Sequence, residues 1–219
     1  MTTPPKKAPF ITLEGGEGTG KSTQARLLAD RLAVAGIDCV VTREPGGSPF
    51  AEEIRALLLD GRLPARTAIA EALLFLAARA DHVAHTIAPA LAAGRWVICD
   101  RFSDSTRVYQ GVAGRVPKAT LADLDRLVLA GLKPDLTLIF DLAPEIGLAR
   151  AGARRPAGSG ADPYEGRDLA YHRELRDGFR AIAADEPDRC VLIDAASTPD
   201  QVAAQVWAAI TSRLPTGSA

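Results

Sequence analysis

The feature that most constrains this chain is a glycine-rich run near its beginning, EGGEGTGKST, at positions 14–23. The run matches the spacing G-x-x-x-x-G-K-[ST] through Gly15, Gly20, Lys21 and Ser22. An apolar stretch typical of a buried strand, FITL, precedes it, and a helical pattern follows. In such a loop successive backbone N–H groups can point inward at a phosphate, and the helix N-terminus adds its dipole. We therefore predict a nucleoside triphosphate site and not a glycine-rich turn without a ligand.

We expect different residues of this loop to bind the nucleoside triphosphate in different ways. Lys21 supplies a positive charge to the outer phosphates, and the Ser22 hydroxyl is suited to hold Mg²⁺. Asp100, at the end of the apolar stretch WVICD, is suited to support the same ion directly or through water. The predicted residues that bind the donor phosphates are Gly15, Gly16, Glu17, Gly18, Thr19, Gly20, Lys21, Ser22 and Thr23.

Short apolar runs rich in β-branched residues alternate along the chain with longer stretches rich in alanine and leucine. This alternation is typical of parallel strands joined by crossover helices, and it predicts an α/β fold. We expect strands at 10–13, 39–42, 96–99, 136–140 and 190–193. We expect helices at about 20–35, 49–59, 67–93, 119–130, 144–153, 168–185 and 199–213.

One segment interrupts this alternation. The stretch RRPAGSGADPYEGRD, at 154–168, contains glycines, prolines and charges without apolar periodicity. With 219 residues, of which 47% are hydrophobic, the chain suits a single domain, 1–219, that carries a mobile lid at about 150–168. Arg150, Arg154 and Arg155 at the entrance to this lid are either a solvated basic helix end or charges that reach the site when the lid closes.

The composition excludes several classes of protein. A formal net charge of −1 argues against a surface built to bind nucleic acid non-specifically. No apolar stretch approaches the roughly 18 to 20 residues that span a bilayer, and no signal-like segment is visible, so we expect a cytoplasmic protein without a membrane partner. Cys39, Cys99 and Cys190 each stand alone in an apolar run, which predicts buried strand cysteines and not a zinc or redox site.

Arginines at the ends of two expected strands point to a second anionic ligand. Arg43 in TREPGGSP and Arg101 in CDRFSDSTRVYQG stand at carboxyl ends of strands, where ligands bind in open α/β sheets. Either arginine alone would more often form a surface ion pair, but two beside a phosphate loop favour ligand binding. Phe75 and Arg79 in EALLFLAARADH are four residues apart, so both can meet one flat ligand, unless Phe75 is core and Arg79 solvated.

The sequence contains no asparagine, so the guanine-specific element N-K-x-D of GTPases is absent. Taken together, its motifs resemble those of the bacterial thymidylate kinases, which phosphorylate thymidine monophosphate (dTMP). EGGEGTGKST, TREPGG, LLFLAARADH and DRFSDSTRVYQG occur in the family's order and approximate spacing, and the likeness covers nearly the whole chain. The resemblance implies a three-layer P-loop sandwich with a five-stranded parallel sheet. It also implies ATP as donor, Mg²⁺ as cofactor, dTMP as acceptor in dTTP synthesis, and a homodimer paired through helices.

The resemblance further implies roles for individual residues. Phe75 would stack on thymine, Arg79 would bond its carbonyl edge, and Tyr109 would lie against the sugar and exclude a 2′-hydroxyl. Glu17 would approach the sugar and the transferring phosphoryl group. The implied acceptor-binding residues are Arg43, Phe75, Arg79, Arg101, Ser105, Tyr109 and Gln110. The implied catalytic residues are Glu17, Lys21, Arg101, Arg150, Arg154 and Arg155.

The chain also departs from the family pattern. Phe102 stands where tyrosine or histidine is common, and Arg107 and Val108 replace smaller or neutral residues. Members of the family carry a catalytic arginine either in the phosphate loop or in the lid, and the loop here has none, which favours the lid arginines. The DAASTPDQ stretch after the last strand is placed to contact adenine. Two other functions stay open: phosphorylation of another nucleoside monophosphate or a nucleoside, and a nucleotide-dependent switch that binds a protein partner.

Overall fold

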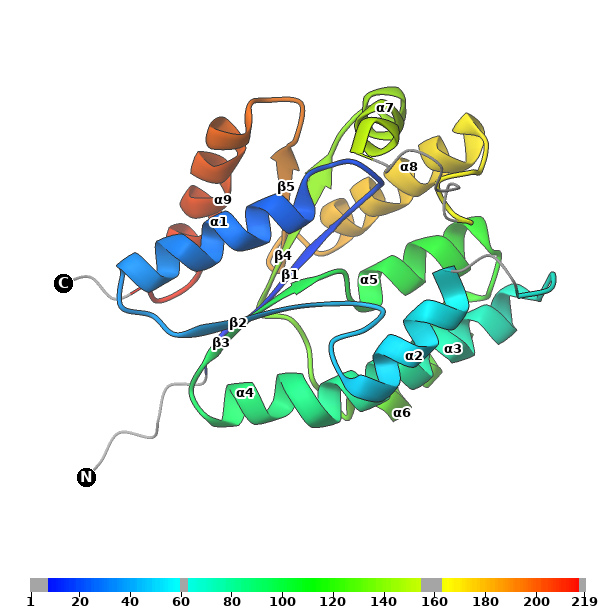
Figure 1. Ribbon diagram of the computed structural model, residues 1–219, viewed down its shortest axis with the longest axis horizontal. Coiled ribbons are helices and arrows are strands. Elements are labelled where there is room, and N and C mark those ends of the chain that lie inside the picture. The colour runs from blue at the N-terminus through cyan, green and yellow to red at the C-terminus, as the bar shows by residue number, and fades with distance from the viewer. Residues whose placement is uncertain (1–7, 60–62, 155–162, 217–219) are drawn as a thin grey trace.

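The computed structural model describes residues 8–59, 63–154 and 163–216 (Figure 1). Its centre is a five-stranded sheet in the order β2-β3-β1-β4-β5, in which every neighbouring pair is parallel. The strands are β1 (Phe10–Gly15), β2 (Cys39–Arg43), β3 (Trp96–Asp100), β4 (Leu136–Asp141) and β5 (Cys190–Asp194). Each predicted strand is present and extends one or two residues beyond its expected carboxyl end.

Helices cover both faces of the sheet. They are α1 (Lys21–Val34), α2 (Pro49–Leu59), α3 (Ala68–His82), α4 (Ala88–Ala92), α5 (Ser103–Thr106), α6 (Lys118–Leu129), α7 (Pro144–Arg154), α8 (Leu169–Asp185) and α9 (Pro199–Arg213), with wider π-helical turns at η1 (Val83–Ile87) and η2 (Arg107–Ala113). Figure 1 shows α1 and α9 side by side against the sheet, and α2, α3 and α6 grouped away from them.

The buried residues explain this three-layer arrangement. Leu28 and Leu32 of α1 and Val206 of α9 pack with Leu13 and the other strand residues of one face. On the opposite side separate clusters join the sheet to η1, α4 and α6, and to η2 and α8. Because β1, β3 and β4 are buried almost throughout, they read as continuous apolar runs in the sequence.

Two helical predictions need correction. The stretch at 67–93 was expected to be one α-helix, but the path consists of α3, η1 and α4. Pro89 has no N–H to donate to the carbonyl four residues earlier, and the wider π-helical turns come just before it. The helical segment formed by α5 and η2 was not expected, because SDSTRVYQG has little apolar periodicity.

The parallel register brings the ends of three strands together. Leu13 of β1 lies opposite Asp100 of β3, and Asp100 lies opposite Arg43 of β2. The phosphate loop that follows β1 therefore lies beside the segment that follows β3. No described helix is long and apolar enough to cross a membrane.

Candidate active site

The loop between β1 and α1 has the geometry that phosphate binding requires. Gly18 and Gly20 adopt positive φ angles of 67° and 92°, a left-handed region that favours glycine. A Cβ on Gly18 would also overlap the carbonyl oxygen of Gly147, because α7 packs backbone to backbone against the loop. The glycines are thus needed both for the curvature of the loop and for the close approach of α7.

Lys21 folds back over this loop. Its Nζ donates to the carbonyl oxygens of Gly15 at 3.1 Å and Gly16 at 2.7 Å, and to Thr19 Oγ1 at 3.3 Å. Burial, with Arg101 as a second cause, lowers the pKa of Lys21 to about 8. The ammonium is therefore held at the loop with donors that can turn to the oxygens of a phosphate.

Ser22 and Asp100 meet at the start of α1. The Ser22 hydroxyl donates to Asp100 Oδ2 at 2.5 Å. A hydroxyl and a carboxylate supply the hard oxygen ligands that Mg²⁺ prefers, and Mg²⁺ commonly takes its other ligands from water and substrate phosphates. The donor set thus fits a magnesium ion beside the phosphate loop.

Arg101 links the phosphate loop to the segment after β3. Its Nη1 donates to Gly15 O at 3.0 Å and to Ser105 Oγ at 3.2 Å, while Nη2 pairs with Glu17 Oε1 at 2.9 Å. The Tyr109 hydroxyl donates to the same Glu17 oxygen at 2.6 Å. Burial alone would raise the pKa of Glu17, but Arg101 and Lys21 outweigh it and lower that pKa to about 2. Glu17 is therefore a carboxylate at neutral pH.

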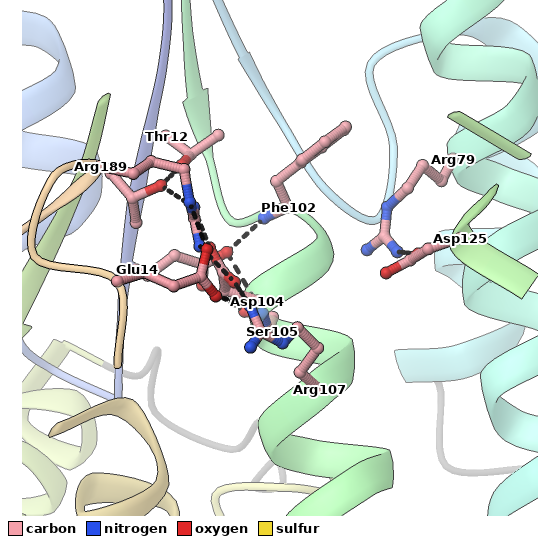
Figure 2. Close-up of polar contacts among 11 residues, drawn as sticks. Thr12, Glu14, Arg79, Phe102, Asp104, Ser105, Arg107, Asp125 and Arg189 are labelled. Atoms are coloured by element: carbon pink, nitrogen blue, oxygen red, sulfur yellow. Dashed lines mark hydrogen bonds and ion pairs between the residues drawn. The ribbon is translucent and has the colours of Figure 1, made fainter. Parts of the chain in front are cut away.

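Glu14 is a buried carboxylate that the sequence analysis missed, and it binds the segment directly after Arg101. Glu14 accepts the N–H groups of Phe102 at 2.8 Å and Ser105 at 3.2 Å, and the Ser105 hydroxyl at 2.6 Å (Figure 2). Burial, and next to it Asp104, raises the pKa of Glu14 to about 7. Glu14 thereby fixes the turn that presents Arg101. Glu14 is the first residue of the glycine-rich run and directly precedes Gly15, which was the available signal.

All the predicted acceptor residues except Arg43 line one cavity of about 90 Å³. They are Phe75, Arg79, Arg101, Ser105, Tyr109 and Gln110. Arg43 instead pairs with Glu52 of α2 at 2.9 Å, and half of its side chain is exposed. Arg55, which was not predicted, lines the cavity and donates to Pro45 O at 2.8 Å. Arg55, and not Arg43, thus lies on the wall of the acceptor cavity.

Tyr164 is a second unpredicted member of this cavity. Its ring centroid lies 6.2 Å from that of Phe75 and 5.8 Å from that of Tyr109. Tyr164 belongs to the stretch that was expected to form the lid, of which residues 155–162 lie outside the described residues. The structure does not test the lid prediction at residues 155–162. The next part of the same stretch places the ring of Tyr164 at the acceptor cavity.

Arg79 is held rigidly at the cavity wall, with 2% of its side chain exposed. Its Nε donates to Glu44 Oε2 at 2.7 Å, and its Nη2 donates to Thr106 Oγ1 at 3.0 Å. His82 Nδ1 lies 3.0 Å from the other Glu44 oxygen. Glu44 from TREPGG was not among the predicted residues, although a buried arginine requires a carboxylate partner.

Of the predicted lid arginines, Arg150 and Arg154 lie on α7, and among the described residues neither makes a hydrogen bond or ion pair with the phosphate loop. Arg150 of α7 donates to Ala195 O at 2.9 Å, in the stretch after β5 that was expected to contact adenine. Arg154 is exposed at the end of α7, and Arg155 lies outside the described residues. Their catalytic role therefore stays a prediction.

Comparison with known proteins gives a consistent result. The family model described as thymidylate kinase matches residues 13–206. The thymidylate kinase of Nitrobacter winogradskyi is 58% identical over 211 residues, which are 96% of this chain and 91% of that protein. That of Bradyrhizobium diazoefficiens is 57% identical over 205 residues, 94% and 90% of the two chains.

A solved structure supports the same assignment. The crystal structure of thymidylate kinase from Ehrlichia chaffeensis matches with a TM-score of 0.74 and 33% identity, over 93% of this chain and 98% of that one. This match confirms the predicted P-loop α/β fold. Together with the family model and the identities above, it shows that this chain belongs to the thymidylate kinase family.

Proposed function

We propose that this chain transfers the γ-phosphoryl group of ATP to dTMP, which gives thymidine diphosphate and ADP in dTTP synthesis. The observation that carries the proposal is the position of Arg101. One guanidinium nitrogen contacts Gly15 and Ser105, and the other contacts Glu17, so this side chain joins the donor loop to the acceptor cavity. A cation between two phosphates can stabilise the charge that spreads over the transferred group.

On the donor side, the loop at 15–23 binds the ATP phosphates, with Lys21 at the outer ones. Ser22 and Asp100 would hold Mg²⁺, which would supply positive charge to offset the negative charge of the donor phosphates. The hydrogen bond between these two side chains supports a shared ion. No covalent phosphoenzyme is needed, because positioning and electrostatic stabilisation suffice for direct transfer.

On the acceptor side, Phe75 and Tyr164 offer ring faces to the base, and Arg79 offers donors at its edge. The contact between Arg79 and Glu44 supports this role, because it fixes the orientation of the guanidinium. Tyr109 lies against both Arg101 and Glu17, where the sugar and its phosphate would lie. Ser105, Gln110 and Arg55 complete the polar wall of the cavity.

We further propose that a lid at about 150–168, within one domain, carries a catalytic arginine. The phosphate loop itself contains no arginine. Replacing Arg150, Arg154 and Arg155 singly by alanine should reveal one position that lowers kcat by on the order of 100-fold, with little change in dTMP affinity. If each single variant and the triple variant kept kcat within about threefold, Arg43 or Arg101 would have to carry this charge.

We propose that the protein is a homodimer. Large apolar side chains are exposed on α2, α3 and α6, which lie together in Figure 1: Phe50, Leu57, Leu73 and Leu127. Leu73→Glu should therefore reduce the mass measured by light scattering to that of one 23.1 kDa chain. Val34→Glu is the matched control, because Val34 is 91% exposed on α1. A monomeric parent protein would contradict the proposal.

We also propose a cytoplasmic location. Cys39, Cys99 and Cys190 are free thiols, which suits a reducing compartment. Fractionation of the native organism with an antibody tests this, and recovery with the membrane or periplasm would contradict it.

An acceptor panel tests the proposed function. The purified protein with ATP and Mg²⁺ should phosphorylate dTMP faster than other nucleoside monophosphates, and should leave thymidine unreacted. A faster reaction with another acceptor would favour a different monophosphate kinase. ATP hydrolysis that no small acceptor alters, but that a protein in a cell extract raises, would favour the switch.

A further inference from the structure

A second and larger cavity, of about 630 Å³, lies between η2, α6 and α8. Its size is within the range of small-molecule sites. It shares no lining residue with the acceptor cavity. The helical segment of α5 and η2 separates the two: Asp104, Arg107 and Gly111 line the large cavity, whereas Ser105 and Tyr109 line the acceptor cavity. One short segment therefore has a different cavity on each face.

One ion pair and one chain neighbour connect the large cavity to acceptor residues (Figure 2). Asp125 of α6 lines this cavity, and its Oδ1 lies 3.6 Å from Nη1 of Arg79, the buried arginine of the acceptor cavity. Neither of these two atoms has a hydrogen-bond partner. Asp104, the neighbour of Ser105, is 1% exposed and pairs with Arg107 at 2.8 Å and with Arg189 at 2.7 Å. A ligand that displaces Asp104 and Asp125 would therefore disturb Ser105 and Arg79, which line the acceptor cavity.

The lining of the large cavity indicates what kind of ligand fits. Its walls include the apolar side chains of Val116, Leu121 and Ile182. Arg107 and Arg189 are already neutralised by Asp104 and Glu186. Lys118, Lys133 and Asp185 also line the cavity, and none of these three has an ion-pair partner among the described residues, so two unpaired positive charges face one negative charge. The unpaired charge is thus mainly positive beside an apolar wall, which is complementary to an amphipathic anion.

We propose that this cavity is an effector site for a small amphipathic organic anion, and that its occupation weakens dTMP binding. The ligand places its apolar body between α6 and α8 and its anionic group near Lys118 and Lys133. Displacement of Asp104 and Asp125 then disturbs Ser105 and Arg79. This coupling rests on the proposed acceptor site.

The probe is 8-anilinonaphthalene-1-sulfonate (ANS), an aromatic sulfonate whose fluorescence rises in apolar sites. We expect one saturable site, and a dissociation constant for ANS that rises about fivefold or more with saturating dTMP. By linkage, saturating ANS must weaken dTMP binding by the same factor in calorimetry. N-Phenyl-1-naphthylamine, which lacks the sulfonate, should bind more weakly, and equal binding would overturn the anionic part of the inference.

Substitutions in α8 locate the site. Ala181 is exposed and lines the cavity, whereas Ala184 is exposed but does not. Ala181→Trp should abolish ANS binding while dTMP binding persists, and Ala184→Trp should leave both unchanged. Lys118→Ala with Lys133→Ala should weaken ANS binding about tenfold.

Several outcomes would overturn the inference. Equal ANS binding by Ala181→Trp and the parent would mean that ANS binds outside the large cavity. Full competition between ANS and dTMP would mean that ANS binds in the acceptor cavity. If dTMP had no effect on ANS binding, the proposed coupling between the two cavities would be wrong. These titrations need no turnover, so they are separate from the acceptor panel, whose failure would instead contradict the proposed function.

Discussion

Phe75 offers the sharpest test of the acceptor site, because it has two neighbours of different kinds. Its ring lines the acceptor cavity and lies 6.2 Å, centroid to centroid, from that of Tyr164. It is also half-buried against the apolar cluster between α2 and α3, which contains Ile54, Leu58 and Ala78. Phe75→Ala removes both contributions, whereas Phe75→Leu keeps an apolar side chain and removes only the flat ring.

The expected magnitudes separate the two contributions. Stacking of a base on an aromatic ring contributes about 1–3 kcal/mol, so loss of the ring should raise the dissociation constant of dTMP about 5-fold to 150-fold in both variants. Full burial of phenylalanine makes Phe→Ala cost about 3–5 kcal/mol of stability, so a half-buried ring should cost about 2 kcal/mol in Phe75→Ala. Phe75→Leu should lose less than this.

Calorimetric titration with dTMP measures the binding change, and titration with a non-hydrolysable ATP analogue is the control, because the donor loop does not contact Phe75. Urea unfolding measures the change in stability. If both variants bound dTMP within about twofold of the parent, Phe75 would be a core residue only, and the proposed stacking would be wrong.

Further predictions concern side chains that meet at Arg101. Tyr109→Ala should let uridine monophosphate compete with its deoxy form as acceptor, because the ring that would block the 2′-hydroxyl is gone; unchanged selectivity would remove Tyr109 from the sugar site. Glu14→Gln should flatten the dependence of stability on pH. Glu14 has a pKa raised from 4.5 to about 7, so the folded chain holds its proton more tightly than the unfolded chain. The parent should therefore lose on the order of 3 kcal/mol of unfolding free energy from this group between about pH 4.5 and 7, as urea unfolding across that window would show.

The sequence was sufficient for the parts of the fold that depend on local patterns. Strands such as Trp96–Asp100 are buried on both faces, so each appears as an unbroken apolar run. The phosphate loop could also be predicted, because its function is carried by backbone N–H groups and glycines of fixed spacing. The segment after β3 is harder: Ser105 and Gln110 are polar residues that line a cavity, so the helical period is not visible in the hydrophobicity of the segment, although Tyr109 packs on Phe179.

Partners that lie far apart in the sequence could not be predicted by the same reasoning. The pairing of Arg79 with Glu44 spans 35 positions, and nothing in either motif specifies it. Arg43 pairs locally with Glu52, nine residues away and within one turn of the start of α2, and its predicted role at the acceptor phosphate stays a prediction. Tyr164 lies in a stretch without periodicity, and only the tertiary structure brings its ring to Phe75.

Arg101 shows why so much buried charge is gathered at this edge of the sheet. Its φ of 71° is left-handed, a conformation that costs a residue with a Cβ about 1–2 kcal/mol. Glu14 offsets this cost, because it accepts the N–H groups of Phe102 and Ser105 that the turn would otherwise leave buried without partners. The strained turn places one planar guanidinium where Nη1 meets both Gly15 of the donor loop and Ser105 of the acceptor wall, while Nη2 meets Glu17 of the loop. A lysine at this position has one compact ammonium and could not hold all three contacts in a fixed planar arrangement, so the strain is tolerated for the fork geometry that arginine alone provides.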